Sequence, residues 1–359
     1  MPRTTIRQIL TRYWNYSAFR PLQEEIIMSV LEGKDTLALM PTGGGKSLCY
    51  QVPALAMDGI CIVISPLIAL MKDQVDSLKK RGIKAVAVHS GMSKTEVDIV
   101  FDNCVYDQEI KFLFLSPERL KTDLARERIR GMKVNLFAVD EAHCISQWGY
   151  DFRPPYLEIA NIRQYHPRVP VLALTATATT LVIRDIQEKL NFPQEHVIRM
   201  SFERRNLAYM VLHEEDKLNR LVRMATRVQG SGVVYVRSRS GTKRIAEHLA
   251  KNKISADYYH AGLDGPTREQ KQDDWMKGKI RVIVCTNAFG MGIDKPNVRF
   301  VAHYDIPDTL EAYFQEAGRA GRDGQNAYAT LLFNDADISD LEEKHRVAFP
   351  PLAEIRNVY

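Results

Sequence analysis

Short runs of apolar residues recur along this chain, and they constrain its fold more than any other feature. Each run is followed by a polar or glycine-containing turn and then by a stretch with helical spacing. The runs cover residues 36–40, 60–65, 85–89, 112–116, 136–139 and 171–174, and then 232–236, 256–259, 282–285, 300–304 and 329–333. Runs this short and this apolar are typical of strands buried on both faces, as in a parallel sheet covered by helices. The pattern predicts an α/β fold with two parallel sheets in series.

A polar and basic stretch, residues 201–206, separates the two series of runs. A helix is expected over residues 217–228, at the start of the second series. We therefore expect one domain over residues 1–203 and a second over residues 204–345.

The end of the sequence predicts a further segment. Two prolines precede apolar residues with helical spacing, as at the start of a helix, just before the sequence stops: Pro350, Pro351, Leu352, Ile355 and Val358. We expect residues 346–359 to be the start of a truncated C-terminal segment, so that the sequence is a fragment of a longer protein.

The composition excludes several classes of protein. A chain of 359 residues with 45% hydrophobic and 26% charged residues can build ordinary cores, unlike a disordered tail, a collagen-like repeat or a disulfide-rich mini-protein. The net charge of +5 is only a weak indication of a polyanionic partner.

The cysteines and the apolar stretches indicate a compartment. Five cysteines lie far apart, without a Cys-x-x-Cys pair or a Cys/His cluster of metal-ligand spacing, so neither zinc nor a disulfide framework is expected. The first residues lack the apolar core of a signal peptide. The longest apolar stretch, residues 59–71, is interrupted by Ser65-Pro66 and is shorter than the ~20 residues of a spanning helix. We expect a soluble, intracellular protein with no membrane contact.

A glycine-rich turn, residues 41–47, follows the first predicted strand and precedes a predicted helix over residues 48–56. Its backbone N–H groups can surround an anion at three glycines: Gly43, Gly44 and Gly45. Lys46 can reach the β and γ phosphates of a nucleotide, and the Ser47 hydroxyl can bind Mg²⁺. Met40 stands where the common phosphate-loop pattern has its first glycine. A glycine-rich turn without a ligand is the alternative.

Two acidic residues follow another predicted strand, at the edge where an open α/β sheet presents its ligands. The strand pattern over residues 134–139 is followed directly by Asp140 and Glu141. Carboxylates in such a place are costly to bury without a cation or a proton to handle. We assign Asp140 to the Mg²⁺ shell and Glu141 to the orientation or deprotonation of the attacking water in phosphoryl transfer. A solvated helix N-terminus is the alternative for this pair alone.

Two arginines lie three residues apart in the second half of the chain. Arg319 and Arg322 would share one face if their segment, residues 314–324, were helical. A guanidinium delivered from one domain to the γ phosphate held by the other would stabilise the charge of the transition state. ATP binding would then clamp the two domains and hydrolysis would release them. A solvated basic turn is the alternative.

An aromatic and basic loop directly follows the acidic pair. Gln147, Trp148, Phe152 and Arg153 place π faces and a guanidinium where a nucleic-acid strand could contact them. A base stacked on an aromatic side chain contributes ~1–3 kcal/mol. Hydrolysis and strand binding would then share one loop, whereas in the alternative the Trp and Phe pack into a core.

In their order along the chain, these motifs resemble those of superfamily 2 helicases, and specifically of the RecQ family of DNA helicases. The similarity spans about residues 13–337, and its most specific part joins Asp140-Glu-Ala-His143 to an aromatic-rich loop that ends at Arg153-Pro154. It implies two tandem RecA-like domains, the first binding ATP and the second supplying an arginine finger. The implied activity is that of an ATP-dependent 3′-to-5′ DNA helicase or translocase that uses ATP and Mg²⁺, without zinc, in repair and recombination. The implied partners are single-stranded DNA and tailed or forked duplexes, bound by a monomer.

Further site residues follow from the resemblance alone. Residues 16–23 are similar to a RecQ motif in which an aromatic stacks on adenine, a Gln reads the base edge and an Arg supports the site; here these are Tyr16, Gln23 and Arg20. Second-domain motifs assign Asp294 and Gln315 to the nucleotide. Contact with the strand, or its coupling to hydrolysis, is implied for Ser65, Arg119, His143, Gln147, Trp148, Phe152, Arg153, Thr175, Thr177, Ser238 and Thr286. The implied catalytic residues are Lys46, Glu141, Arg319 and Arg322.

Some features depart from the family pattern. Tyr150 stands where the aromatic-rich loop of the family usually has His. The family's four-cysteine zinc site, winged helix and terminal helical domain have no counterpart in the sequence, so duplex separation by a winged-helix pin is not expected from these residues. A nucleotide-gated binding module that hydrolyses ATP but unwinds poorly is one alternative function, and an RNA remodeller is another.

Overall fold

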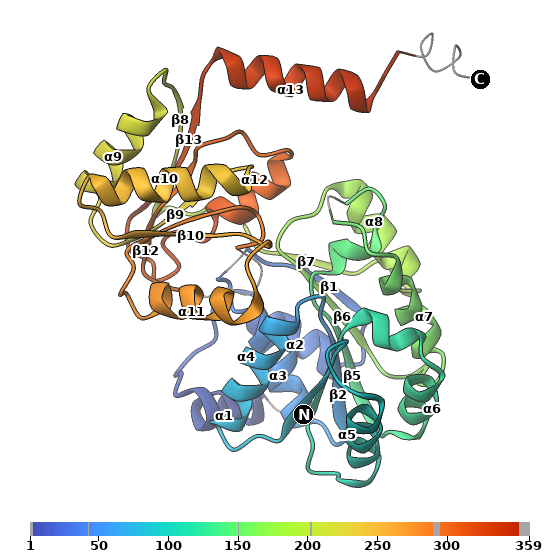
Figure 1. The fold of residues 1–359 in the computed structure, drawn as a ribbon. Coiled ribbons are helices and arrows are strands. Elements are labelled where there is room, and N and C mark those ends of the chain that lie inside the picture. The colour runs from blue at the N-terminus through green and yellow to red at the C-terminus, as the bar shows by residue number, and fades with distance from the viewer. Residues whose placement is uncertain (1–2, 42, 150, 202, 290–294, 352–359) are drawn as a thin grey trace. The chain divides into compact units, whose positions relative to one another are not determined.

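The computed structural model describes residues 3–41, 43–149, 151–201, 203–289 and 295–351. The chain divides into two compact units, Met1–Glu203 and Arg204–Tyr359 (Figure 1). Each unit is built on one sheet in which every strand pair is parallel. The predicted fold class, two parallel sheets flanked by helices, is confirmed.

The sheet of the first unit has the strand order β3-β4-β2-β5-β6-β1-β7. Its strands are β1 (Thr36–Leu39), β2 (Ile60–Ile64), β3 (Ala85–Val88), β4 (Phe112–Leu115), β5 (Val134–Val139), β6 (Val171–Thr175) and β7 (Val197–Arg199). Every residue of β1, β2, β4, β5 and β6 is buried. Because β2, β5, β6 and β1 are neighbours and parallel, the loops after these four strands meet at one edge of the sheet.

Helices cover both faces of this sheet (Figure 1). They are α1 (Arg3–Trp14), α2 (Gln23–Leu31), α3 (Lys46–Ala56), α4 (Ile68–Lys79), α5 (Lys94–Tyr106), α6 (Asp123–Gly131), α7 (Glu158–Arg163) and α8 (Thr180–Lys189). One apolar layer contains side chains of α2, α3 and α4, such as Ile26, Cys49 and Met71. The opposite layer contains side chains of α5 to α8, such as Phe101 and Ile186. Short 3₁₀ segments, η1 (Pro117–Lys121), η2 (Ala142–Ile145) and η3 (Pro154–Leu157), lie in the connections.

The sheet of the second unit has the order β10-β11-β9-β12-β13-β8. Its strands are β8 (Leu207–His213), β9 (Ser231–Tyr235), β10 (Ala256–Tyr259), β11 (Val282–Cys285), β12 (Val298–His303) and β13 (Ala327–Phe333). Its helices are α9 (Lys217–Arg227), α10 (Arg239–Lys251), α11 (Gly265–Met276), α12 (Leu310–Ala317) and α13 (Asp335–Ala348). Side chains of α9 and α10 pack in one apolar layer, and Trp275 of α11 and Ala317 of α12 lie in the other.

Helix α13 crosses the boundary expected at residue 345. It begins with a capping box between Asn334 and Asp337 and has no buried residue. The residues on which a following helix was predicted, 352–359, lie outside the described part of the chain. In the part that is described, no helix combines the length and the apolar character needed to cross a bilayer.

Candidate active site

The phosphate loop lies between β1 and α3. Helix α3 begins at Lys46, two residues earlier than the pattern predicted, so Lys46 and Ser47 occupy its first turn. Gly43 and Gly45 both have left-handed backbones, with φ of 79° and 78°, which glycine adopts without steric cost. A side chain at Gly45 would also collide with the amide of Gln23. The helix N-terminus and the left-handed glycines have the arrangement that the predicted anion cradle requires, but the Gly44 N–H donates to the carbonyl of Pro41 at 3.0 Å and is taken up within the loop.

Two side chains of residues 16–23 hold this loop from outside. The Arg20 guanidinium donates to the carbonyl of Gly43. Gln23, which is buried, donates through Nε2 to the carbonyls of Gly44 and Gly45 at 3.2 and 3.1 Å. Its Oε1 accepts from the backbone N–H of Arg20 at 2.9 Å. The segment expected to recognise the base is therefore bonded to the loop expected to hold the phosphates.

Three other residues are predicted to contact the nucleotide. The Tyr16 ring is 51% exposed, as a ring that stacks on a base must be before the base arrives. Gln315 is buried in α12 of the second unit. Asp294 lies outside the described residues.

Asp140 and Glu141 follow β5, at the sheet edge that β1 also reaches. The Asp140 N–H donates to the carbonyl of Ile64 at 2.8 Å and so extends the pairing with β2. Glu141 has a left-handed backbone, with φ of 47° and ψ of 48°. Its Oε1 lies 3.7 Å from the Lys46 ammonium. The structure thus brings the predicted water-activating carboxylate next to the predicted phosphate-binding lysine.

Burial, and secondarily the Glu141 charge, raises the pKa of Asp140 to about 6. We expect Asp140→Asn to stabilise the nucleotide-free protein above that pH. The folded state holds the proton of this carboxyl more tightly than the unfolded chain does. The protonated carboxyl therefore contributes its full stabilisation of the folded state below about pH 4, and this stabilisation is lost as the pH rises through about 6. Ionised Asp140 then costs on the order of 2–3 kcal/mol. The melting temperature of the variant should exceed that of wild type at pH 7.5 but not at pH 4. An equal difference at both pH values would contradict this interpretation.

His143 connects the acidic pair to the end of β6. Its Nδ1 lies 2.9 Å from Thr175 Oγ1 and 3.4 Å from Glu141 Oε2. The Thr175 hydroxyl donates to the carbonyl of Thr177 at 3.1 Å, so it accepts from the Nδ1–H of His143. Burial lowers the pKa of His143, which keeps the ring neutral and leaves Nε2 as an acceptor. These contacts link three residues that the sequence assigned to coupling.

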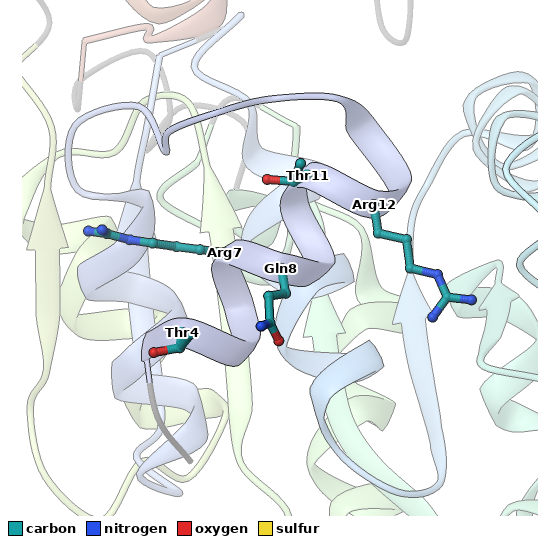
Figure 2. Close-up of a pocket in the computed structure, with 5 residues that line it drawn as sticks. All are labelled: Thr4, Arg7, Gln8, Thr11 and Arg12. Carbon is teal, nitrogen blue, oxygen red and sulfur yellow. The ribbon is translucent and has the colours of Figure 1, made fainter.

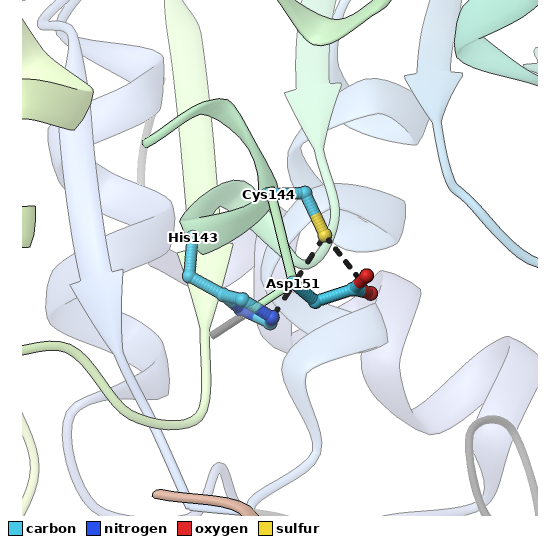
Figure 3. Close-up of side chains that lie close together, drawn as sticks. All are labelled: His143, Cys144 and Asp151. Atoms are coloured by element: carbon cyan, nitrogen blue, oxygen red, sulfur yellow. Dashed lines mark hydrogen bonds between the residues drawn. The ribbon is translucent and has the colours of Figure 1, made fainter. Parts of the chain in front are cut away.

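The relay continues from His143 into the aromatic-rich loop (Figure 3). Cys144 Sγ lies 3.8 Å from His143 Nε2 and 3.7 Å from Asp151 Oδ2. Arg153 binds the same oxygen of Asp151 through Nε and Nη2 at 3.1 and 3.0 Å, and its Nη1 donates to the carbonyl of Pro66 at 3.3 Å. The loop is therefore joined to the segment after β2 as well as to the acidic pair.

The side chains of His143, Cys144 and Asp151 also have the proximity of a metal site. A thiol must ionise to bind a metal, and burial raises the pKa of Cys144 well above its usual value. Asp151 is already paired with Arg153. We therefore interpret the cluster as a set of polar contacts in which the one thiol proton of Cys144 is donated either to His143 Nε2 or to Asp151 Oδ2.

The exposed part of this loop carries Trp148. Its side chain is 67% exposed, so the alternative in which it packs into a core is wrong. Gln147 is exposed as well, whereas Phe152 is half-buried with the Lys189 ammonium 5.8 Å from its ring centre. Tyr150 lies outside the described residues.

Two residues predicted to contact a strand occupy the same sheet edge. Ser65 is buried directly after β2, and its hydroxyl acts against the raised pKa of Asp140. The Arg119 guanidinium donates to the carbonyl of His89 at 2.7 Å and to that of Met92 at 3.1 Å. Arg119 thus holds the loop after β3 in place.

Two further coupling residues lie in the second unit. Ser238 caps α10, because its hydroxyl accepts from the N–H of Gly241 at 3.0 Å. Thr286 is buried after β11. Like Ser65 in the first unit, both stand at the carboxyl ends of strands.

The segment with the two arginines corrects an expectation. Helix α12 ends at Ala317, so Arg319 and Arg322 lie in turns and do not share a helical face. Arg319 is buried and is hydrogen-bonded to the hydroxyl of Tyr235, which donates to the carbonyl of Phe289 at 3.0 Å. Arg322 is partly exposed. Of the two guanidiniums, that of Arg322 is the one with access to a ligand.

The sequence did not assign roles to Cys144, Asp151 or Tyr156, although all three bond to site residues. The Tyr156 hydroxyl donates to the Asp140 carbonyl at 2.9 Å. Spacing carries no signal for such contacts, because they depend on how the loop folds back.

A shallow cavity of about 680 Å³ lies elsewhere in the first unit, along α1 (Figure 2). It is lined by five side chains of that helix, Thr4, Arg7, Gln8, Thr11 and Arg12. None of them belongs to the site described above.

Models of two protein families match the chain. A DEAD/DEAH box helicase model matches residues 20–186, and a model of the helicase conserved C-terminal domain matches residues 215–324. Among solved structures, the helicase MrfA bound to DNA is similar with a TM-score of 0.78 and 17% identity, over 98% of this chain and 55% of that one. The DEAD-box helicase Mss116 bound to single-stranded RNA has a TM-score of 0.76 at 17% identity, over 94% and 74% of the two chains. These structures share the tandem RecA-like fold.

Relatives with higher identity are named as ATP-dependent DNA helicases. The chain is 45% identical to the ATP-dependent DNA helicase RecQ of Pasteurella multocida, over 95% of this chain and 54% of that protein. It is 42% identical to the probable ATP-dependent DNA helicase RecS of Bacillus subtilis, over 95% of this chain and 69% of that protein. The chain thus spans about half the length of the first of these relatives and about two thirds of the second. It belongs to the RecQ family of ATP-dependent DNA helicases.

Proposed function

We propose that this chain is the motor part of a DNA helicase that hydrolyses ATP and moves 3′ to 5′ on single-stranded DNA. The observation that carries the proposal is the continuous relay of contacts from Lys46 and Glu141 through His143 to the aromatic-rich loop. It joins groups suited to hydrolysis to an exposed Trp148 suited to stacking on a base. The names of the relatives support DNA as the strand.

ATP is the substrate in this proposal, with its phosphates on the loop at residues 43–47. The Lys46 ammonium has an ion-pair partner but no hydrogen-bond partner within the described residues. Its N–H groups can therefore donate to the phosphate oxygens of a nucleotide. Glu141 orients the attacking water and accepts its proton. Arg322 stabilises the charge that develops on the γ phosphate. Each residue thus acts on a different part of the reacting group.

Mg²⁺ fits the residues next to the loop. Ser47 offers a hydroxyl and Asp140 a carboxylate, and hard oxygen ligands of this kind suit the ion. The raised pKa of Asp140 marks a carboxylate that is costly to ionise without a cation beside it. When bound, the ion would neutralise phosphate charge. Its proposed ligands are Ser47 and Asp140.

The proposed nucleic-acid partner is single-stranded DNA, as found in tailed or forked duplexes, and we propose that a monomer binds it. Stacking on Trp148 and contacts with the loops after β2, β6, β9 and β11 would hold the strand. Such a protein would work where DNA is kept, in the bacterial cytoplasm or the eukaryotic nucleus, during repair and recombination.

The role of Trp148 has its own test. We expect Trp148→Ala to remove most of the stimulation of ATP hydrolysis by single-stranded DNA, with the basal rate nearly intact, because the catalytic carboxylates stay while their trigger is lost. DNA affinity should fall only modestly, since most binding energy comes from backbone phosphates. Phosphate release with and without a DNA oligonucleotide measures the effect. Tyr106→Ala, at another exposed aromatic of the first unit, is the matched control. Unchanged stimulation in the Trp148 variant would remove this residue from the proposal.

Helicase activity itself is tested by strand displacement on duplexes with a 3′ or a 5′ tail, beside an ATPase assay on the same DNA. The proposal predicts ATP-dependent displacement on the 3′-tailed duplex and little on the other. Hydrolysis without displacement would favour a nucleotide-gated binding module, and stronger stimulation by RNA than by DNA would favour an RNA remodeller.

A further inference from the structure

We propose that Tyr156 is a positioning residue that carries the signal of strand contact from the aromatic-rich loop to the catalytic backbone. The inference rests on the proposed function, because it concerns how DNA stimulates hydrolysis. It assigns the transmission to one hydroxyl group, the Tyr156 Oη, and to one peptide group, that between Asp140 and Glu141.

Tyr156 stands where the loop returns to the sheet. It lies in η3, the short helical segment that begins directly after Arg153, and its side chain is fully buried. Its hydroxyl donates to the carbonyl of Asp140 at 2.9 Å. A buried hydroxyl needs such a partner, whereas packing alone would be served equally well by a phenyl ring. The hydroxyl therefore has a function beyond filling the core.

The bond acts on the peptide group that sets the backbone of Glu141. The oxygen of this peptide group accepts from Tyr156, and its N–H, that of Glu141, donates to Asp140 Oδ1 at 3.0 Å. The peptide plane is thus held at both ends. Glu141 follows it in a left-handed conformation that residues other than glycine adopt only with support. A turn of this plane would swing the Glu141 carboxylate away from its place beside Lys46.

The loop is bonded so that its movement reaches Tyr156. The N–H of Arg153 donates to the carbonyl of Cys144 at 2.8 Å, which closes the loop at its base. Gly149 lies so close to the carbonyl of His143 that a Cβ there would come within 2.7 Å of the oxygen. The first of these contacts ties the residue just before η3 to the segment after Glu141, so a change at Arg153 reaches Tyr156 within η3. Displacement of the loop by a bound strand shifts the hydroxyl, and with it the peptide plane.

The test is Tyr156→Phe in the whole 359-residue chain, measured as ATP hydrolysis with and without a single-stranded DNA oligonucleotide. The ratio of stimulated to basal rate should fall about fivefold or more, as expected from a hydrogen bond whose loss leaves its partner without a donor. The KM for ATP and the affinity for a fluorescent DNA oligonucleotide should change little, because neither binding surface is altered. Tyr165→Phe, at a partly buried tyrosine of the same unit, should leave the ratio unchanged.

A double variant separates transmission from a structural role. If the hydroxyl transmits what Trp148 senses, Trp148→Ala combined with Tyr156→Phe should have the same ratio as Trp148→Ala alone. Reductions that multiply would overturn the inference, and so would a proportional loss of basal and stimulated rates together with a lower melting temperature. Full stimulation in Tyr156→Phe would overturn the inference alone. A wild-type chain that DNA does not stimulate would overturn the proposed function, and the inference with it.

Discussion

Replacing Glu141 by Gln is expected to reduce ATP turnover by about 10³-fold while the protein still binds ATP. Glutamine has nearly the same shape as glutamate but cannot accept the proton of the attacking water. The phosphate loop, Lys46 and Ser47 keep their contacts, and so ground-state binding is retained. Phosphate release measures turnover, and a fluorescent ATP analogue measures binding. Turnover near the wild-type rate would remove Glu141 from its assigned role.

Lys46→Ala is the matched comparison for Glu141→Gln. It removes the ammonium that lies 3.7 Å from Glu141 and that would contact the β and γ phosphates. Hydrolysis should be nearly abolished, as in the glutamine variant. Binding of the analogue should be weaker as well, because Lys46 holds the ground state. The two variants thus distinguish a defect in the hydrolysis step from a defect in nucleotide binding.

Replacing Arg322 by Ala is expected to slow hydrolysis by about 10³-fold with little change in ATP affinity, if its contact forms mainly in the transition state. Arg319→Ala is the informative partner of this variant. Because Arg319 is buried against the hydroxyl of Tyr235, its loss should lower the melting temperature, which Arg322→Ala should leave nearly unchanged. Weaker ATP binding with an unchanged maximal rate in Arg322→Ala would show that this residue holds the ground state instead.

The interior strands could be predicted from the sequence, because a strand that is buried on both faces is apolar throughout. The two strands that the pattern missed, β7 and β8, are edge strands, whereas the pattern did predict the other two edge strands, β3 and β10. β7 has three residues and one of them is buried, and the pattern along β8 is mostly exposed. An edge strand needs no continuous apolar run, so its place follows from its partners, β1 and β13.

The site divides in the same way into local and non-local parts. Lys46, Asp140 and Glu141 could be predicted because each lies next to a strand end in the sequence, and the strand order places those ends together. The contact between Tyr156 and Asp140 joins residues sixteen positions apart, and no spacing rule indicates it. The burial of Arg319 also had no local signal, because it depends on the end of α12 at Ala317 and on packing against Tyr235.

The central claim is that one chain couples ATP hydrolysis to single-stranded DNA through the loop after Asp140-Glu141. The measurement that tests it most directly is the rate of ATP hydrolysis by the 359-residue chain, alone, with single-stranded DNA and with RNA of the same sequence. The contacts from Glu141 through His143 to the aromatic-rich loop predict a slow basal rate that rises steeply with DNA, and the proposed function predicts a smaller rise with RNA. A rate that is the same with and without DNA, or one that rises more with RNA, would contradict it.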